Sequence, residues 1–447
     1  MAQPRFGTDG IRGRAPEDLT VDLARAVGRA AAAVLRPKRA VIGRDTRGSG
    51  PALSDGVIDG LISAGVDVVD LGVLPTPGIA FVAAQLDCPG FVISASHNPS
   101  SDNGIKVIGV GGTKLGVADE ESIEEHLDDP APLTIESSQR GSLLVDGSLS
   151  DRYIDHVVGA VPPGALSGMR IALDCANGAA SATAGEIFQR LGAEVVVLAV
   201  DPDGENINDG VGSTHPEFLS SHVVALGATL GLAFDGDADR LVAVDETGAV
   251  VPGDALLALF ATDLQEHGDL VGDTVVVTVM SNLGFHRAMR AAGIAVTTVG
   301  VGDRNVVEAM DAERVSLGGE QSGHIIFREL ATTGDGVLTG VILADLVNRS
   351  GQALSALSSE ALTLVPQYLQ AVPIAPGSDV QGAQALWSRV AEMEASLGER
   401  GRILVRASGT EPVVRVMVEA DDDDEARALT EELAALVRTT LGASTAR

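Results

Sequence analysis

The chain has 447 residues, of which 45% are hydrophobic, 21% are charged and 53 are Gly. This length allows roughly three domains with a sizeable core in each, and it excludes a small disulfide-stapled scaffold. Asp and Glu outnumber Lys and Arg by 62 to 31, and the resulting formal net charge of −31 would repel nucleic acid over most of the surface.

The two cysteines, Cys88 and Cys175, lie far apart and form no CxxC or Cys/His cluster. This usage fits a reducing compartment and excludes a zinc site. The sequence begins without a basic segment followed by an apolar stretch, and its uncharged run Leu71–Leu86 is broken by Pro75 and Pro77. We therefore expect a cytoplasmic protein with neither a signal peptide nor a membrane span.

A pattern of helix, Gly and β-branched strand occurs three times along the chain. Its copies are Ser63–Leu71, Arg190–Leu198 and Ala291–Val299. Each copy follows an apolar strand and a short polar turn, so each is typical of a βαβ unit with a Gly C-cap on its helix. Chance similarity among βαβ units is the alternative to a true repeat.

The repeat spacing is that of whole domains, which predicts three related α/β domains with mixed, mostly parallel sheets. The segment from Gln367 onward differs, since strands at Arg402–Val405 and Val413–Val418 precede an amphipathic helix within Asp424–Leu441. We expect a smaller C-terminal α+β domain there. The predicted domains are 1–152, 153–253, 254–366 and 367–447.

The first candidate site is the loop Ile93–Pro99, which follows a short apolar run. Ligand sites of α/β proteins form where strands end, so a hydroxyl here would face a cleft. The loop places Ser96 beside His97 and Asn98, and Lys106 follows soon after. This groups a nucleophilic oxygen with donors and a cation that can stabilise phosphoryl charge. The alternative is a turn whose side chains cap the backbone.

The second candidate is an acidic loop with Asp235, Asp237 and Asp239 at alternate positions. The apolar runs Leu230–Phe234 and Leu241–Val244 predict a strand on either side. Three carboxylates separated by small residues can converge on one hard cation and leave room for a phosphate oxygen, which suits Mg²⁺.

A calcium-binding EF-hand is the rival interpretation of this acidic loop. An EF-hand needs Gly where Arg240 stands, and it needs helices where strands are predicted. We therefore exclude calcium, and a solvated acidic turn stays as the other alternative.

The third candidate is the loop Gly318–His324, after the short run Val315–Leu317. Its glycines would bring the backbone close to a ligand. Glu320 and Ser322 could bind sugar hydroxyls or an amine, and His324 could titrate near neutral pH. A purely structural role for His324 is the alternative.

The fourth candidate combines Arg406, Ser408, Gly409 and Thr410, with Arg415 beyond them. A guanidinium, two hydroxyls and a Gly turn are the parts of a phosphate-binding loop. A plain turn is the alternative. The chain contains no GxxxxGK[ST] loop for a nucleotide.

The four loops, in this order, resemble those of the α-D-phosphohexomutase superfamily across essentially the whole chain. The segments that carry the resemblance are Phe6–Gly13, Ile93–Pro99, Asp235–Arg240, Gly319–His324 and Arg406–Pro412. Gln321 and the Phe-Gly-Thr-Asp-Gly start are most similar to the bacterial branch that acts on glucosamine phosphate.

The resemblance implies a four-domain enzyme around a central cleft, an isomerase that interconverts glucosamine 6-phosphate and glucosamine 1-phosphate. Phosphate on Ser96 would be the donor and a 1,6-bisphosphate the intermediate, with a hexosamine or hexose 1,6-bisphosphate as primer. The product would supply UDP-N-acetylglucosamine and thereby peptidoglycan synthesis. A homodimer is possible within this resemblance, and small sugar phosphates are the expected partners.

The resemblance also implies residue roles. One Mg²⁺ per subunit would be bound by Ser96 through its phosphate and by Asp235, Asp237 and Asp239. The implied catalytic residues are Ser96, Lys106, His324 and Arg12. The implied substrate-binding residues are His97, Asn98, Arg240, Glu320, Ser322, Arg406, Ser408, Gly409, Thr410 and Arg415.

Two other functions stay open from the sequence. One is a phosphomannomutase/phosphoglucomutase, which would prefer neutral sugars. The other is a member of the superfamily that has lost catalysis and serves as a sugar-phosphate sensor. The presence of Ser96 and of all three metal carboxylates argues against the sensor.

Overall fold

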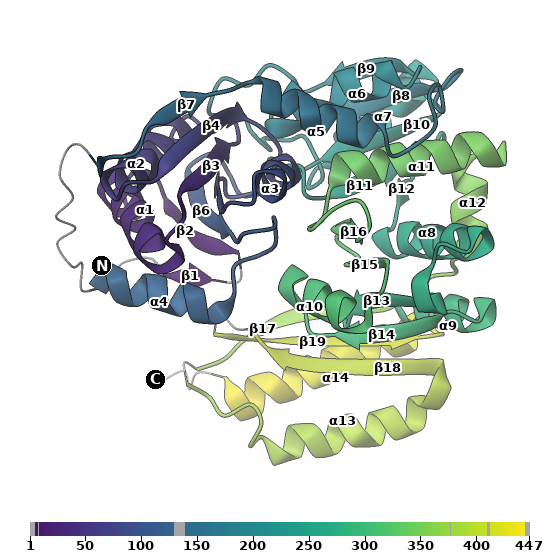
Figure 1. Ribbon diagram of the computed structural model, residues 1–447. Helices are drawn as coiled ribbons and strands as arrows, with labels where there is room; N and C mark the ends of the chain where they lie inside the picture. The colour runs from purple at the N-terminus through teal and green to yellow at the C-terminus, as the bar shows by residue number, and fades with distance from the viewer. Residues whose placement is uncertain (1–4, 8, 129–138, 376, 409–411, 443–447) are drawn as a thin grey trace. The chain divides into compact units, whose positions relative to one another are not determined.

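A computed structural model describes residues 5–7, 9–128, 139–375, 377–408 and 412–442. Contacts divide the chain into two compact units (Figure 1). Unit 1 comprises Met1–Met280 and Gly293–Ala361, and unit 2 comprises Ser281–Ala292 and Leu362–Arg447. Among the described residues, no helix combines the length and the apolar character needed to span a bilayer.

Unit 1 begins with a mixed sheet of strand order β1-β2-β6-β5-β3-β4-β7. Its strands are β1 (Phe6–Gly7), β2 (Gly10–Arg14), β3 (Arg39–Arg44), β4 (Asp67–Val73), β5 (Gly90–Ile93), β6 (Asp102–Ile108) and β7 (Leu143–Val145). Its helices are α1 (Val21–Leu35), α2 (Gly50–Ser63), α3 (Thr76–Gln85), α4 (Val117–Asp128) and α5 (Ser148–Val158). Helices α1 and α2 can pack closely because a Cβ on Gly60 would lie 2.2 Å from the Arg25 carbonyl oxygen.

The second sheet of unit 1 has the order β12-β11-β10-β8-β9. Its elements are β8 (Arg170–Asp174), a 3₁₀ turn (Ala179–Ala182), α6 (Ala184–Arg190), β9 (Glu194–Leu198), α7 (Pro216–Leu226), β10 (Leu230–Phe234), β11 (Leu241–Val244) and β12 (Val250–Val251). The buried strand β10 pairs in parallel with β8 and antiparallel with β11. The β10–β11 hairpin therefore carries the acidic loop at its tip.

The third sheet of unit 1 has the order β14-β13-β15-β16. Its elements are α8 (Gly253–His267), a 3₁₀ turn (Val271–Asp273), β13 (Thr274–Thr278), β14 (Ala295–Val299), α10 (Asp303–Glu313), β15 (Leu317–Gly319), β16 (Ile325–Phe327), α11 (Gly336–Ser350) and α12 (Leu354–Ala361). The third candidate loop connects the antiparallel strands β15 and β16.

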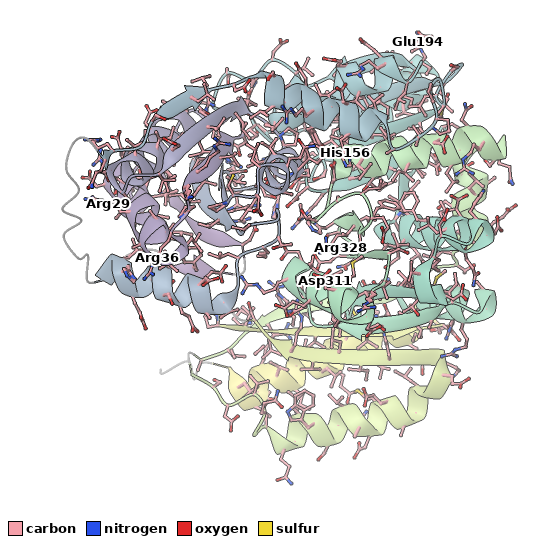
Figure 2. All side chains as sticks on the ribbon, viewed as in Figure 1. Arg29, Arg36, His156, Glu194, Asp311 and Arg328 are labelled. Carbon is pink, nitrogen blue, oxygen red and sulfur yellow. The ribbon has the colours of Figure 1, made fainter. Side chains whose placement is uncertain are left out.

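A cavity of about 200 Å³ in unit 1 is lined in part by Tyr153, His156, Arg328 and Asp335. Figure 2 labels His156, which lies on α5, and Arg328, which follows β16. The Tyr153 hydroxyl lies 3.0 Å from Asp335 Oδ2, and Asp335 Oδ1 accepts the Leu338 N–H at 2.9 Å. This buried carboxylate therefore connects α5 to the first turn of α11.

Unit 2 is built on the antiparallel sheet β17-β19-β18. Its elements are α9 (Leu283–Ala292), β17 (Gln367–Pro373), α13 (Gln384–Leu397), a 3₁₀ turn (Gly398–Arg400), β18 (Gly401–Ala407), β19 (Val413–Ala420) and α14 (Asp423–Leu441). The core side chains of α13 and α14 pack against those of the sheet. The buried Glu419 accepts from the Leu283 N–H at 3.0 Å and from Arg402 Nε at 2.5 Å, and so joins α9 to the sheet.

The repeated helix–Gly–strand pattern is present in the structure. Gly65, Gly192 and Gly293 follow α2, α6 and α9 with φ of +86°, +96° and +75°, the left-handed conformation that Gly adopts at a C-cap. The strands that flank these helices pair in parallel in all three copies. The predicted α/β fold class with a smaller C-terminal domain is confirmed.

Candidate active site

Ser96 lies just beyond β5, where the sequence predicted a functional hydroxyl. Its side chain is buried, and its backbone has a φ of +51°, which is uncommon for a residue other than Gly. Ser96 Oγ donates to Asp235 Oδ2 at 2.6 Å and lies 3.2 Å from His97 Nδ1. The hydroxyl thus points at the acidic loop instead of capping its own turn.

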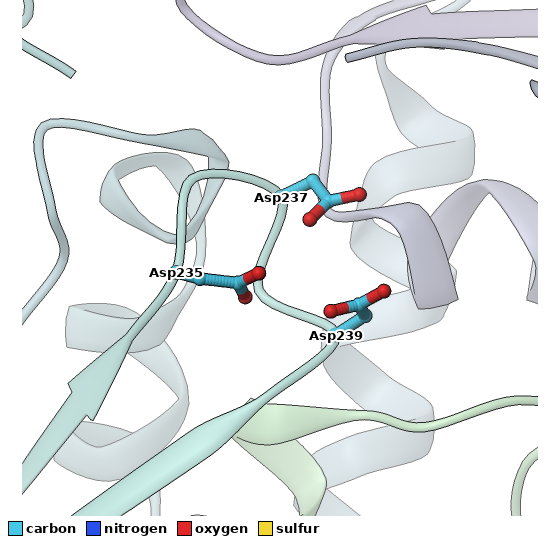
Figure 3. Close-up of side chains that lie close together, drawn as sticks. All are labelled: Asp235, Asp237 and Asp239. Atoms are coloured by element: carbon cyan, nitrogen blue, oxygen red, sulfur yellow. The ribbon is translucent and has the colours of Figure 1, made fainter. Parts of the chain in front are cut away.

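The acidic loop brings Asp235, Asp237 and Asp239 together (Figure 3). One oxygen from each lies within 4.8 Å of the others, and all three residues are buried. Burial and the two neighbouring carboxylates raise the pKa of Asp235 well above its ordinary value.

Two oxygens of this triad, Asp237 Oδ1 and Asp239 Oδ1, are buried without a hydrogen-bond partner among the described residues. Burying an unsatisfied carboxylate oxygen is costly, so such oxygens point to a ligand that completes them. An all-oxygen set of three carboxylates suits a hard divalent cation. The residues of this chain therefore fit a metal.

Lys106 lies on β6 and faces the same carboxylates. Its Nζ is 2.9 Å from Asp237 Oδ2, 3.0 Å from Asp9 Oδ2 and 3.8 Å from Asp239 Oδ2. Burial opposes the charged form, but these carboxylates outweigh it and raise the pKa of Lys106. Lys106 is therefore a fixed cation. Arg12, on β2, also donates to Asp9, so the sheet order β2-β6-β5 brings both predicted cations to the side of Ser96.

Arg240 and His324 also lie close to the triad. Arg240 donates its N–H to Asp235 Oδ1 at 3.3 Å, and its Nη1 lies 3.4 Å from His97 Nδ1. His324 Nδ1 is 3.8 Å from Asp239 Oδ2, while its Nε2 accepts the Gly334 N–H at 3.1 Å. Burial lowers the pKa of His324, but the neighbouring Asp239 outweighs burial, and the net result is a raised pKa. Burial and Arg240 lower the pKa of His97.

The loop with Glu320 and Ser322 packs directly on the β10–β11 hairpin. Leu241 donates its N–H to the Gly323 carbonyl oxygen at 3.1 Å, and a Cβ on Gly323 would lie 2.0 Å from the Leu241 carbonyl oxygen. Glu320 accepts the Gly302 N–H at 3.0 Å, and Ser322 Oγ has no hydrogen-bond partner among the described residues. The loop's free hydroxyl is thus held at a fixed distance from the acidic triad.

The strand before this loop begins at the end of the apolar run Val315–Leu317, since β15 starts at Leu317. Arg314 ends α10 in a left-handed conformation, and Val315 donates its N–H back to Met310. The turn that closes α10 therefore includes the first residue of the apolar run.

The fourth candidate site belongs to unit 2 and is described only in part. Arg406 on β18 and Arg415 on β19 are direct partners across the ladder, and both are half-buried. Ser408 donates its N–H to the Val413 carbonyl oxygen at 2.9 Å. Gly409 and Thr410 lie outside the described residues.

Sequence reasoning missed several residues around the triad. Asp9 contacts both Lys106 and Arg12, and Thr76 donates its hydroxyl to Asp237 Oδ2 at 2.6 Å. Asn98, which was predicted to contact substrate, donates to Asp102 Oδ2 at 3.0 Å. The start motif contained Asp9, and Thr76 follows β4 at a strand end, so the strand-end rule that identified Ser96 would also have identified Thr76.

Comparison with known proteins identifies the family. Models described as phosphoglucomutase/phosphomannomutase α/β/α domains I, II and III match residues 3–132, 151–248 and 252–365. The model of the C-terminal domain matches residues 369–436. The chain belongs to the phosphoglucomutase/phosphomannomutase family.

Close relatives within the phosphoglucomutase/phosphomannomutase family share a single name. A protein named phosphoglucosamine mutase from Rhodococcus erythropolis is 49% identical over 97% of this chain and 98% of its own. Another of that name, from a Mycobacterium species, is 50% identical over 95% and 96%. A family protein of solved structure from Burkholderia thailandensis is 27% identical, with a TM-score of 0.81 over 97% of both chains. The predicted class, an isomerase of the mutase type, is confirmed.

Proposed function

We propose that this enzyme interconverts glucosamine 6-phosphate and glucosamine 1-phosphate, with Ser96 as the residue that carries the phosphoryl group. The observation that carries the proposal is the 2.6 Å contact between Ser96 Oγ and a buried triad of carboxylates. A serine hydroxyl beside three buried carboxylates is suited to carry a phosphoryl group next to a cation that the carboxylates bind. The names of relatives at 49% and 50% identity support glucosamine phosphate as the substrate.

Asp235, Asp237 and Asp239 would hold one Mg²⁺ together with the phosphate on Ser96. Mg²⁺ bound there supplies Lewis-acid stabilisation of negative charge on the phosphoryl oxygens. The oxygens of Asp237 and Asp239 that lack partners are the donors available for it.

In the first half-reaction the phosphoryl group leaves Ser96 Oγ and forms a bond to O1 of glucosamine 6-phosphate. The O1 hydroxyl gives up its proton, and Ser96 Oγ takes up a proton as its bond to phosphorus breaks. Lys106 stays protonated at neutral pH, so it stabilises charge and does not act as a base. His324, whose Nδ1 faces Asp239, is the candidate for the proton transfer. Arg12 joins Lys106 in stabilising the transferred group.

The second half-reaction starts from glucosamine 1,6-bisphosphate turned end for end. The bond between O6 and phosphorus breaks as the phosphoryl group passes to Ser96 Oγ. Ser96 Oγ gives up its proton, O6 takes one up, and glucosamine 1-phosphate leaves. In both orientations the enzyme must bind the sugar and the distal phosphate. We assign the reacting end to His97, Asn98 and Arg240, the sugar to Glu320 and Ser322, and the distal phosphate to Arg406, Ser408, Gly409, Thr410 and Arg415.

The domain boundaries after residues 152, 253 and 366 form part of this proposal. So do a cytoplasmic location and a hexose 1,6-bisphosphate primer. The primer is needed because an enzyme whose serine has lost its phosphate cannot start a cycle, whereas a bisphosphate can donate one phosphate to Ser96.

The test compares glucosamine, glucose and mannose 6-phosphates as substrates with Mg²⁺ and glucose 1,6-bisphosphate. Wild type, Ser96→Ala and Ser101→Ala are measured side by side, because Ser101 is an exposed serine of the same loop. We expect a preference for glucosamine 6-phosphate that is lost only in Ser96→Ala. Equal turnover of the neutral sugars would favour a phosphomannomutase/phosphoglucomutase. A wild type without turnover or serine phosphate would favour a sensor.

A further inference from the structure

Arg47 is a completely buried arginine that follows β3 and contacts the loop of Ser96. Its Nη2 donates to the carbonyl oxygens of Ser96 and Asn98, both at 2.8 Å. Its Nη1 donates to the carbonyl oxygen of Asp102 at 3.0 Å and to that of Pro99. One guanidinium therefore donates hydrogen bonds to four backbone carbonyl oxygens of the segment around Ser96.

The charge of Arg47 is balanced beside it. Arg47 Nε donates to Asp45 Oδ2 at 2.9 Å, so all five guanidinium N–H groups have an acceptor. Asp45 Oδ2 also accepts from Ser94 Oγ at 2.6 Å, and Ser94 Oγ in turn accepts the Ser96 N–H at 2.9 Å. The ion pair thus holds the Ser96 residue through both its N–H and its carbonyl oxygen.

A second donor reaches the same oxygens from the other side. Asn208 Nδ2 lies 2.9 Å from the Ser96 carbonyl oxygen and 3.1 Å from that of Asn98. Gly236, in the acidic loop, completes the enclosure, since a Cβ there would lie 2.6 Å from the Ser96 carbonyl oxygen and 3.0 Å from Asn208 Nδ2. The peptide after Ser96 is therefore fixed by donors and by steric contact with the acidic loop itself.

We propose that Arg47 and Asn208 are positioning residues that hold Ser96 in its left-handed conformation and so aim Oγ at Asp235. The φ of +51° at Ser96 is an unfavourable conformation for a residue with a side chain and persists only where the surroundings determine it. The only side chains that donate to the Ser96 carbonyl oxygen among the described residues are Arg47 and Asn208. This inference rests on the proposed role of Ser96 as the phosphoryl carrier.

Arg47→Lys is the sharpest variant because it keeps the charge next to Asp45 and loses the planar fork. A single ammonium offers three N–H groups and cannot span the oxygens of Ser96 and Asp102 together. Asn208→Ala is the second variant, and it leaves the Arg47–Asp45 ion pair intact. Leu61→Ala, a buried core residue of α2, is the control for loss of stability without contact to the loop.

Two activity readouts are compared at temperatures equally far below each variant's own unfolding midpoint. In steady-state turnover of glucosamine 6-phosphate, we expect both loop variants to lose up to about 100-fold in kcat, as a misaimed reacting group does. The KM should change less than about twofold, because neither residue is assigned to the substrate. The rate at which glucose 1,6-bisphosphate phosphorylates Ser96, followed by intact mass, should fall by the same factor as kcat.

Hydrogen–deuterium exchange of residues 94–104 provides a readout that needs no activity. We expect faster exchange there in Arg47→Lys and Asn208→Ala, with α1 and α2 unchanged, and wild-type exchange in Leu61→Ala at this loop. Loop variants that match wild type in kcat and exchange would overturn the inference, as would equal losses in Leu61→Ala. If wild type itself proves inactive, the proposed function fails, and the exchange experiment alone decides whether Arg47 and Asn208 order the loop.

Discussion

At the scale of single residues, the positive charge of Lys106 keeps the buried carboxylates of the site together when no metal is bound. Its ammonium is within 3.0 Å of carboxylate oxygens of Asp237 and Asp9 and is almost fully buried. Removing one partner of a buried ion pair leaves the other charge buried without a counter-charge, which lowers stability. Lys106 is therefore as important for keeping the acids together as it is for charge stabilisation.

We predict that Lys106→Met destabilises the metal-free protein by about 3 kcal/mol. Thermal unfolding in the presence of a chelator measures the loss. Mg²⁺ should restore more stability to this variant than to wild type, since the cation replaces the missing charge. Lys114→Met, which removes a more exposed ammonium paired with Asp303, is the control. Equal melting of Lys106→Met and wild type in chelator would contradict the prediction.

Removal of the metal should abolish turnover and leave the fold in place. Lys106 and Arg240 keep the triad partly neutralised when no cation is bound. We expect EDTA to stop the reaction with an unchanged far-ultraviolet circular dichroism spectrum, and Mg²⁺ to restore it. In Asp239→Asn the affinity for Mg²⁺ should fall about tenfold or more, because one ligand charge is lost. A chelated protein that stays active would refute the assignment of this site.

At the scale of secondary structure, the site depends on how neighbouring hairpins pack. The tip of β15–β16 rests on β11 at Gly323, where the left-handed φ is +90° and the Leu241 carbonyl oxygen fills the space of a Cβ. Both the conformation and the contact require Gly. This backbone contact helps to hold the loop of Glu320 and Ser322 on the β10–β11 hairpin.

Gly323→Ala should therefore lower the stability of the protein by more than the unfavourable φ of Ala alone would. We expect a loss of about 3 kcal/mol in stability and a raised KM for glucosamine 6-phosphate. Gly268→Ala is a matched control, because its φ is +80° but nothing lies within 4 Å of the added Cβ. Thermal unfolding and steady-state kinetics distinguish the two variants, and equal effects would show that the packing on β11 is unimportant.

The N-terminus of α11 should make stability depend on pH. Burial raises the pKa of Asp335 from 3.8 to about 6, so folding takes up a proton between these values. This contribution to stability is fully present below pH 3.8 and is lost as the pH rises through about 6. Between pH 5 and 7.5, wild type should lose about 1 kcal/mol more than Asp335→Asn, whose side chain still caps the helix.

Unfolding midpoints of both proteins at pH 5 and pH 7.5 test this expectation. The quantity to compare is the difference between the proteins at each pH, since other titrating groups cancel in it. A difference that stays constant with pH, or that changes in the opposite direction, would contradict the assigned pKa of Asp335.

Local patterns predicted the elements and the loops of the site, but not the contacts that connect them. The runs Leu230–Phe234 and Leu241–Val244 match β10 and β11 residue for residue, because two continuous apolar runs separated by an acidic turn are visible in the sequence. Arg47 and Asn208 lie in loops without a recognisable motif. Their roles arise only when chain segments far apart in the sequence meet at one peptide.

At the scale of the whole molecule, the two units defined by contacts do not follow the order of the chain in the way that the predicted domains do. The predicted third domain, 254–366, contains α9, whereas contacts assign Ser281–Ala292 to unit 2. Asn282 explains the assignment, since its side chain bonds both the N–H and the carbonyl oxygen of Val365 at 2.9 Å and also reaches Glu419. The predicted domain boundaries stay predictions.

A chain that ends at Ala361 should therefore be damaged at α9 and not only lack its C-terminal domain. The truncation removes Val365 and Glu419, the partners of the residues that begin α9. We expect α9 amides to exchange with solvent much faster than in the full chain, as hydrogen–deuterium exchange measures. Unchanged protection of α9 would show that unit 1 alone supports this helix.

The interrupted course of unit 2 has a consequence for biosynthesis. The ribosome releases Ser281–Ala292 before it makes roughly 70 further residues of unit 1, and only then come the strands that α9 joins, a delay of about 3 to 14 s at ordinary elongation rates. During that interval the segment of α9 lacks Val365 and Glu419, its hydrogen-bond partners in unit 2. We expect a chaperone that binds nascent chains to meet this segment late in synthesis, when most of unit 1 has already been made.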